Sequence, residues 1–184
     1  MWVNLPADDK LAPSHYQDLR AGMHAVHTEP GVLVQVISGQ TASAVGPAVN
    51  HWPILGMLVT LDPRTEYRQV LDADQRAFAY VISGRLMIVG SELRAGQIAW
   101  SDPVSWPGES TTLAGEPTTL ALATGDADEP TRVMLYAGRP IGEQVVAGGP
   151  FVMNTRAEIE QAYRDFHSGK FGSIPRHTRL PAGA

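Results

Sequence analysis

The six histidines are the residues of this chain with the clearest capacity for metal or acid–base chemistry, since the sequence contains no cysteine. His24 and His27, followed closely by Glu29, combine residue types that bind transition metals. A three-residue step along a strand, however, points two side chains to opposite faces of a sheet. Two histidines and one acid also provide fewer ligands than a well-formed site needs. We therefore keep His24 and His27 as metal candidates but predict no metal site at them.

His51 lies between Asn50 and Trp52, and convergent polar and aromatic side chains are a common feature of ligand pockets. We predict a pocket lined by His51, Trp52 and Trp106. The alternative interpretation is an ordinary loop histidine without a binding role. His51 is also the third candidate, with His24 and His27, for a rearranged metal site.

Sequence motifs for other common chemistries are missing. The chain has no Gly-x-Ser-x-Gly nucleophile elbow, no glycine-rich phosphate loop that ends in lysine, and no dinucleotide-binding fingerprint. The lack of cysteine excludes disulfides, thiolate metal sites and a cysteine nucleophile. Asp62, Asp72, Asp74 and Asp102 could pair for acid–base catalysis, but loop acids of this kind more often form turns. We predict no catalytic residue.

The composition favours a single soluble domain with many turns. A chain of 184 residues can bury one sizeable core, and its 18 glycines and 14 prolines favour turns over long helices. The net charge of -5 disfavours direct contact with nucleic acid, whose backbone is also negative. No apolar run of signal-peptide or membrane-spanning length occurs early in the sequence. We therefore expect a cytoplasmic protein that contacts neither nucleic acid nor a membrane.

The elements that would position the candidate residues are short strands. Two strand-forming runs, residues 78–82 and 85–89, flank Ser83 and Gly84 and predict a β-hairpin across a glycine turn. Further strands are predicted at residues 2–5, 32–37, 54–61, 97–100, 118–124 and 132–137, with a long loop at residues 41–53. Many short strands at this spacing are typical of an antiparallel sandwich or a small barrel.

One segment near the C-terminus has helical periodicity. Thr155 and Glu158 form a capping-box pattern, which satisfies backbone donors at the start of a helix. The apolar residues that follow recur at steps of three and four and form one stripe: Ile159, Ala162, Tyr163 and Phe166. Gly169 suits the left-handed conformation that ends a helix. We predict a helix at about residues 155–168 and a flexible tail at residues 173–184.

The sequence around this helix resembles that of a known family. Residues 137–146 read AGRPIGEQVV, residues 149–155 read GPFVMNT and residues 169–172 read GKFG. Together they resemble the C-terminal signature of the pirin family, with Gln144 in place of the usual proline. The opening residues 2–7 (WVNLPA) look like the segment that leaves the family's first barrel.

Pirins consist of two cupin barrels in one chain, so the resemblance implies an all-β, cupin-type jelly-roll β-barrel with a C-terminal α-helix. Residues 1–22 would form a connector with an N-terminal strand, and residues 23–172 would form the second barrel with its helix. The family's site for iron or another divalent metal lies in the first barrel, and this sequence is expected to begin where that barrel ends. The resemblance therefore implies no cofactor in this chain.

The resemblance also indicates which residues stand at the metal-ligand positions of a cupin. Metal cupins carry a His-x-His step and a glutamate before a hairpin glycine, and a last histidine after a Pro-x-Gly turn. Aligning the chain on these glycines places the following residues there: Ala77 at the glutamate, Ala99 at the last histidine, and Leu71 with Ala73, or Val70 with Asp72, at the first two. Because apolar side chains cannot bind a metal, we predict a metal-free barrel.

The strand around residues 78–82 also predicts an interaction surface. Regular alternation places Ala77, Ala79 and Val81 in the interior and Phe78, Tyr80 and Ile82 on the outside, although a bulge would swap the two faces. An outward apolar row on a sheet needs a cover. We predict an interface at Trp2, Phe78, Tyr80 and Ile82, and hence a homodimer or a complex with another protein.

Two functions follow from these observations. The first is a pirin-like second barrel without its own metal site, which acts as a structural or protein-interaction module. The alternative is an enzyme like the family's quercetin 2,3-dioxygenases, with iron or another divalent metal bound by a rearranged set of His24, His27 and His51.

Overall fold

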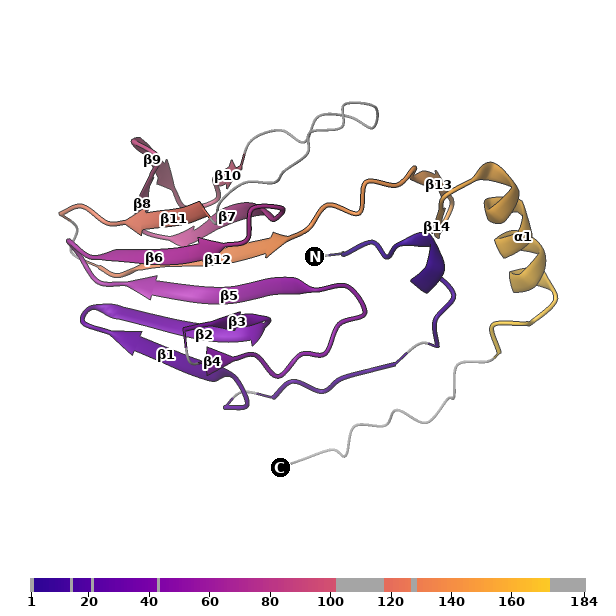
Figure 1. Ribbon diagram of the computed structural model, residues 1–184, viewed down its shortest axis with the longest axis horizontal. Helices are drawn as coiled ribbons and strands as arrows, with labels where there is room; N and C mark the ends of the chain where they lie inside the picture. Colours follow the sequence, from indigo (N-terminus) through magenta and orange to yellow (C-terminus); the bar gives the residue numbers. More distant parts are fainter. Residues whose placement is uncertain are drawn as a thin grey trace. The chain divides into compact units, whose positions relative to one another are not determined.

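The structure is a computed structural model that describes residues 2–13, 15–20, 22–42, 44–101, 118–126 and 129–172 (Figure 1). The chain divides into two compact units, Met1–Gly142 and Glu143–Ala184. The predicted pocket residue Trp106 and the predicted tail at residues 173–184 lie outside the described residues.

The first unit contains two main antiparallel sheets. The larger has the strand order β1 (Ala25–Glu29), β2 (Val32–Ser38), β5 (Ile54–Leu61), β12 (Thr131–Gly138), β7 (Arg76–Ser83) and β10 (Ile98–Trp100). The smaller has the order β6 (Glu66–Leu71), β11 (Thr118–Ala123), β8 (Arg85–Ile88) and β9 (Ser91–Arg94), and a two-residue pair joins β3 (Gln40–Thr41) to β4 (Ala44–Val45). The predicted all-β fold is confirmed.

Buried side chains from both sheets form one core. The largest fully buried ones include Met57, Val59 and Leu135 from the six-stranded sheet and Leu86 and Leu122 from the four-stranded sheet. In these strands the buried side chains recur at every second position, so one face of each sheet packs into the core and the other faces outward.

The faces of β7 are those expected from regular alternation. Ala77, Ala79 and Val81 are at most 6% exposed, whereas Tyr80 and Ile82 are each 38% exposed. The register of β7 with β12 shifts near Ile82, but the shift does not exchange the inward and outward residues. Because the inward side chains of β7 are small, larger side chains from other strands fill the interior next to it.

The predicted hairpin across Gly84 is wrong. β7 pairs with β12 and β10, whereas β8 pairs with β9 and β11, so the chain passes from one sheet to the other between Ser83 and Arg85. Gly84 has a φ of +82°, and a Cβ on it would lie 2.4 Å from Thr131 Oγ1. The Thr131 hydroxyl accepts from the Arg85 N–H at 3.1 Å and donates to the Arg85 carbonyl at 3.0 Å. Thr131 thus fixes the crossing point.

The N-terminal connector also differs from expectation. Residues 2–5 form no strand, and the only regular element before β1 in the described part of the connector is a short 3₁₀ helix, η1 (Ala7–Asp9). The first part of the connector is held by the Lys10 ammonium, which donates to Asn4 Oδ1 and to the Leu5 carbonyl, both at 2.8 Å. The predicted long loop at residues 41–53 also contains β4.

The second unit consists of β13 (Val146–Gly148), β14 (Phe151–Met153) and α1 (Arg156–His167). The predicted C-terminal helix is confirmed together with its capping box, because the Thr155 hydroxyl accepts from the Glu158 N–H and the Glu158 carboxylate accepts from the Thr155 N–H. Gly169 follows the helix with a φ of +76°, which suits the left-handed cap.

The GPFVMNT signature positions this helix. Gly148 lies directly beneath Ile159, since a Cβ on it would come within 2.6 Å of that side chain. The Phe151 ring contacts Tyr163 edge to face, with 5.1 Å between the ring centroids, and also lies near Phe166 and Phe171. The signature therefore encodes close packing between the β13–β14 hairpin and α1.

Candidate functional site

The interior positions that correspond to cupin metal ligands are occupied by apolar side chains. Leu71 and Ala77 are each 6% exposed, and Ala99 is partly buried against the core. Asp72, the remaining acid at these positions, is exposed at the turn after β6, where its N–H donates to the Gln75 side chain at 3.1 Å. Among the described residues, no group of three or more histidine, aspartate or glutamate side chains could hold a metal ion. These residues do not fit a cupin iron site.

A neutral polar triad lies in the interior close to these positions. Thr41 Oγ1 on β3, together with the Tyr67 hydroxyl and Gln69 Oε1 on β6, forms a triangle with sides of 2.7 Å. Both hydroxyls donate to the carboxamide oxygen, and Gln69 Nε2 donates to the Val70 carbonyl at 2.7 Å. Burial raises the pKa of Tyr67, so the phenol remains protonated and the triad uncharged. The triad therefore stabilises the interior through hydrogen bonds and offers no anionic group to a metal.

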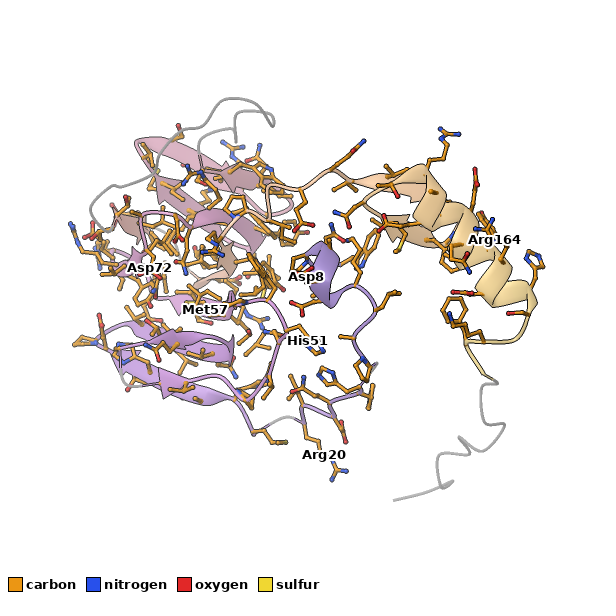
Figure 2. The ribbon with its side chains drawn as sticks, turned by 45° about the vertical axis from the view of Figure 1, so that its right-hand side comes forward. Asp8, Arg20, His51, Met57, Asp72 and Arg164 are labelled. Carbon is orange, nitrogen blue, oxygen red and sulfur yellow. The ribbon has the colours of Figure 1, made fainter. Side chains whose placement is uncertain are left out.

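The candidate histidines lie in different surroundings. His27 on β1 pairs with Glu29, with 2.8 Å between Nε2 and Oε1, because two positions along a strand share one face. His24 precedes β1. His51 lies outside the sheets on the connector side, whereas Met57 lies between them (Figure 2). Within the described part of the chain, His24, His27 and His51 do not form a common metal-binding group.

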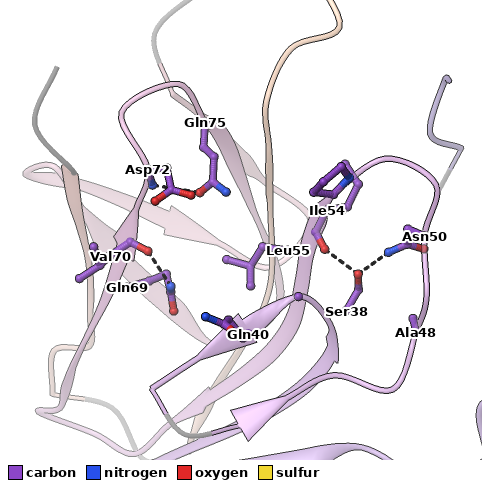
Figure 3. A pocket seen from close by; sticks show the side chains of 12 residues that line it. Ser38, Gln40, Ala48, Asn50, Ile54, Leu55, Gln69, Val70, Asp72 and Gln75 are labelled. Atoms are coloured by element: carbon purple, nitrogen blue, oxygen red, sulfur yellow. Dashed lines mark hydrogen bonds between the residues drawn. The ribbon is translucent and has the colours of Figure 1, made fainter. Parts of the chain in front are cut away.

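A first pocket of about 400 Å³ opens next to the polar triad (Figure 3). Gln69, Asp72 and Gln75 lie on one side of it, and Ser38 and Asn50 lie on the other. The Ser38 hydroxyl donates to the Ile54 carbonyl and accepts from Asn50 Nδ2, both at 2.5 Å. Among the described residues that line this pocket, the polar side chains are therefore mostly carboxamides, together with the Ser38 hydroxyl and the Asp72 carboxylate.

A second pocket of about 500 Å³ lies between the connector and the outward face of the six-stranded sheet. Its lining includes the predicted residues His51 and Trp52, while Trp106 is not among the described residues. The other lining residues are Val3, Leu5, His15, Gln17, Ile37, Ser38, Ala48, Val49, Asn50, Ile54, Gly56 and Tyr136. The pocket is therefore mainly apolar and aromatic, with histidine, tyrosine and carboxamide groups at its walls.

Hydrogen bonds hold the walls of the second pocket in place. Gln17 pairs with both backbone groups of Val49, donating to its carbonyl at 2.5 Å and accepting from its N–H at 2.8 Å. Gln17 Nε2 also lies 3.0 Å from His15 Nε2, which must accept because the carboxamide nitrogen can only donate. Trp52 Nε1 donates to the Arg139 carbonyl at 2.9 Å, and the Arg139 guanidinium lies 5.1 Å from the centre of the indole ring.

The outward face of the same sheet carries a row of aromatic side chains. Tyr136 on β12, Phe78 on β7 and Trp100 on β10 are paired in register, with ring centroids 5.0 Å and 4.7 Å apart. Trp100 is 70% exposed, and Ile98, which pairs with Tyr80 on the next row, is 45% exposed. We call this surface, which consists of Phe78, Tyr80, Ile82, Ile98 and Trp100, the apolar face.

Comparison with known proteins decides the family. Residues 56–172 match the family model described as the pirin C-terminal cupin domain. The chain belongs to the pirin family. Over 172 residues it is 33% identical to Pirin-1 of Arabidopsis thaliana and 32% identical to pirin of Homo sapiens. These alignments cover 94% of this chain, but only 57% and 56% of the two relatives.

Solved structures confirm the cupin fold of this pirin-family chain. A crystal structure of quercetin 2,3-dioxygenase from Acinetobacter baumannii is 30% identical, with a TM-score of 0.76. The superposition covers 94% of this chain and 56% of that enzyme. The chain thus spans little more than half the length of the relatives that it matches. No helix among the described residues has the length and hydropathy needed to cross a membrane.

Several residues of these surfaces were not predicted from the sequence. His15, Gly56 and Tyr136 complete the second pocket, and Ile98 and Trp100 extend the apolar face. The signal for Ile98 and Trp100 was available, because outward residues of a strand recur at every second position. No comparable signal exists for the pocket, because its walls come from segments far apart in the sequence. Of the predicted interface residues, Trp2 is 71% exposed in the connector.

Proposed function

We propose that this pirin-family chain acts as a protein-interaction module without a metal centre of its own, and that its partner is a second copy of the chain. The apolar face is the observation that carries this proposal. In it Trp100 is 70% exposed, and Tyr80, Ile82 and Ile98 are between 38% and 45% exposed. Leaving this much apolar surface in water costs free energy. Burial against a partner would remove that cost.

The strand order supports association at this place. β10 is the last strand in the order of the six-stranded sheet, with Ile98 and Trp100 on its outward side. Aromatic side chains are enriched at the centres of protein interfaces, where their large area is removed from water. A second copy offers the same apolar face, which is the self-complementarity that a two-fold dimer requires.

The test is the molar mass in solution across a range of concentrations. We expect dimers by light scattering coupled to size exclusion at micromolar concentrations, and dissociation when Tyr80→Glu puts a charge in the apolar face. Val45→Glu is the matched control, because Val45 is 64% exposed on β4, away from that face. A monodisperse monomer at all concentrations would refute the proposed dimer.

A second candidate function is oxidation of a flavonol, favoured by the likeness to the Acinetobacter baumannii quercetin 2,3-dioxygenase. Apolar side chains stand at the cupin ligand positions of the described residues, and they argue against this function because they cannot bind a metal. Steady turnover of quercetin by the isolated chain, abolished by His51→Ala, would establish it. We expect no turnover.

A further inference from the structure

The second pocket has a lining that suits a particular chemical class of ligand. We propose that it binds a neutral, planar aromatic molecule that carries a hydroxyl group. The site goes beyond the proposed dimer, because it takes a small molecule and is built largely by the connector and the loop before β5. Its volume of about 500 Å³ lies within the range of small-molecule sites in proteins.

Flat hydrophobic surfaces form the walls of this pocket. Gly56 on β5 pairs with Tyr136 on β12, and the tyrosine ring lies over the glycine, where a Cβ would come within 3.3 Å of Cε1. The missing side chain at Gly56 therefore leaves room for the ring to lie close to the sheet. Ile37 and Ile54 provide the adjoining aliphatic surface. A planar aromatic ligand can stack on such a wall over a large area.

The part of the wall that contains Trp52 and His51 is held in place before any ligand arrives. The Trp52 indole is fixed by its hydrogen bond to the Arg139 carbonyl and by the guanidinium on its ring. The His51 ring meets the His15 ring nearly edge to face, with 5.2 Å between the centroids. Because these rings are already oriented, binding costs less conformational entropy than it would in a pocket that must form around its ligand.

Polar groups in the pocket match a hydroxyl. Among the described residues, neither the Tyr136 hydroxyl nor the His51 ring nitrogens have a hydrogen-bond partner. Burial raises the pKa of Tyr136, so its hydroxyl remains a donor at neutral pH. A neutral imidazole offers one donor and one acceptor. A ligand hydroxyl can therefore accept from Tyr136 and donate to His51.

The lining also disfavours a charged ligand. Among the described residues that line it, none is an aspartate, glutamate, lysine or arginine. Burying an ion in such a site would remove its hydration without an opposite charge in return. A neutral phenol avoids this desolvation cost and can hydrogen-bond to both the Tyr136 hydroxyl and the His51 ring.

The test uses three probes that share one carbon skeleton: 2-naphthol, naphthalene and decahydro-2-naphthol. We expect 2-naphthol to bind the full chain, as measured by its fluorescence, and decahydro-2-naphthol to displace it poorly because it cannot stack. Tyr136→Phe should weaken 2-naphthol about fivefold, the effect of one net hydrogen bond, and leave naphthalene unchanged. His51→Ala should weaken both aromatic probes, since it removes a wall as well as a polar group.

Tyr16→Phe is the matched control, because Tyr16 lies in the connector next to His15 but is 90% exposed and does not line the pocket. It should bind all three probes as the unmodified chain does, and thermal unfolding should show each variant folded. Equal displacement by the saturated alcohol would overturn the proposal. So would a Tyr136→Phe variant that binds 2-naphthol as tightly as before, or an absence of 2-naphthol binding.

Discussion

Replacing Gly84 with alanine should destabilise the first unit far more than a turn substitution normally does. Gly84 lies where the chain crosses from the six-stranded sheet to the four-stranded sheet, with a φ of +82°. An added Cβ would lie 2.8 Å from the Thr131 Cα, a backbone atom that cannot move by a change of rotamer. Relief of this clash has to displace Thr131, whose hydroxyl bonds both backbone groups of Arg85.

The magnitude follows from two contributions. A left-handed backbone costs an alanine about 1 kcal/mol relative to glycine. Loss of the two Thr131 hydrogen bonds adds about 1 kcal/mol each. We expect Gly84→Ala to lower the free energy of unfolding by about 3 kcal/mol. Gly90→Ala should lower it by only about 1 kcal/mol, because Gly90 has a similar φ of +76° but nothing within 4 Å of its added Cβ.

Urea denaturation followed by tryptophan fluorescence measures this difference. All 4 tryptophans lie within residues 1–142, so their emission reports the first unit rather than the helical unit. Equal midpoints for the Gly84→Ala and Gly90→Ala variants, at unchanged slope, would refute the reasoning. That result would mean that Gly84 is open to solvent, as in a plain hairpin, and that Thr131 does not hold the crossing.

Two other predictions concern the interior. Burial raises the pKa of Tyr67 above its ordinary value of 10.0, so the unfolded chain loses this proton first and stability falls as the pH rises above 10.0. Tyr67→Phe should therefore lower the free energy of unfolding at pH 7, by about 1 kcal/mol, but make its decline in alkaline urea titrations shallower; an unchanged decline would contradict this. Chain purified without chelator or histidine tag should contain no stoichiometric iron, nickel, copper or zinc by plasma mass spectrometry. Near-stoichiometric metal would contradict our interpretation of Leu71, Ala77 and Ala99.

The elements that could be predicted are those whose signals are local. The helix α1 follows from Thr155, Glu158 and an apolar stripe within one stretch of chain, and the structure contains the same cap. Alternation along β7 likewise depends only on neighbouring residues. For α1 the sequence window that carries the signal also contains the capping contacts that stabilise the helix. For β7 only the direction of the side chains is local, because the strand itself is held by pairing with β12 and β10.

The hairpin prediction failed because its signal does not specify a pairing partner. A glycine at positive φ between two strand-forming runs suits a hairpin and a crossing between sheets equally well. The choice depends on Thr131, which lies 46 positions beyond Arg85. A long-range packing contact thus overrides the local turn signal.

The polar interior was missed for a related reason. β6 alternates exposed and buried residues, and its inward Gln69 looks unsuited to a core until Thr41 and Tyr67 are placed beside its carboxamide oxygen. Thr41 lies 28 positions before Gln69. A buried carboxamide is tolerated only when it is hydrogen-bonded, and that condition cannot be read from β6 alone.

The residues that reveal the family differ in kind from those on which a function depends. Gly149 and Phe151 of the signature, and Gly148 directly before it, pack against α1, and a Cβ on Gly149 would reach within 2.0 Å of the Tyr163 hydroxyl. Such contacts constrain the fold and leave other surfaces free to change. The proposed dimer and the proposed ligand site depend instead on positions such as Trp100 and Tyr136, which are outside the signature. Family membership and molecular function therefore have to be tested on separate sets of residues.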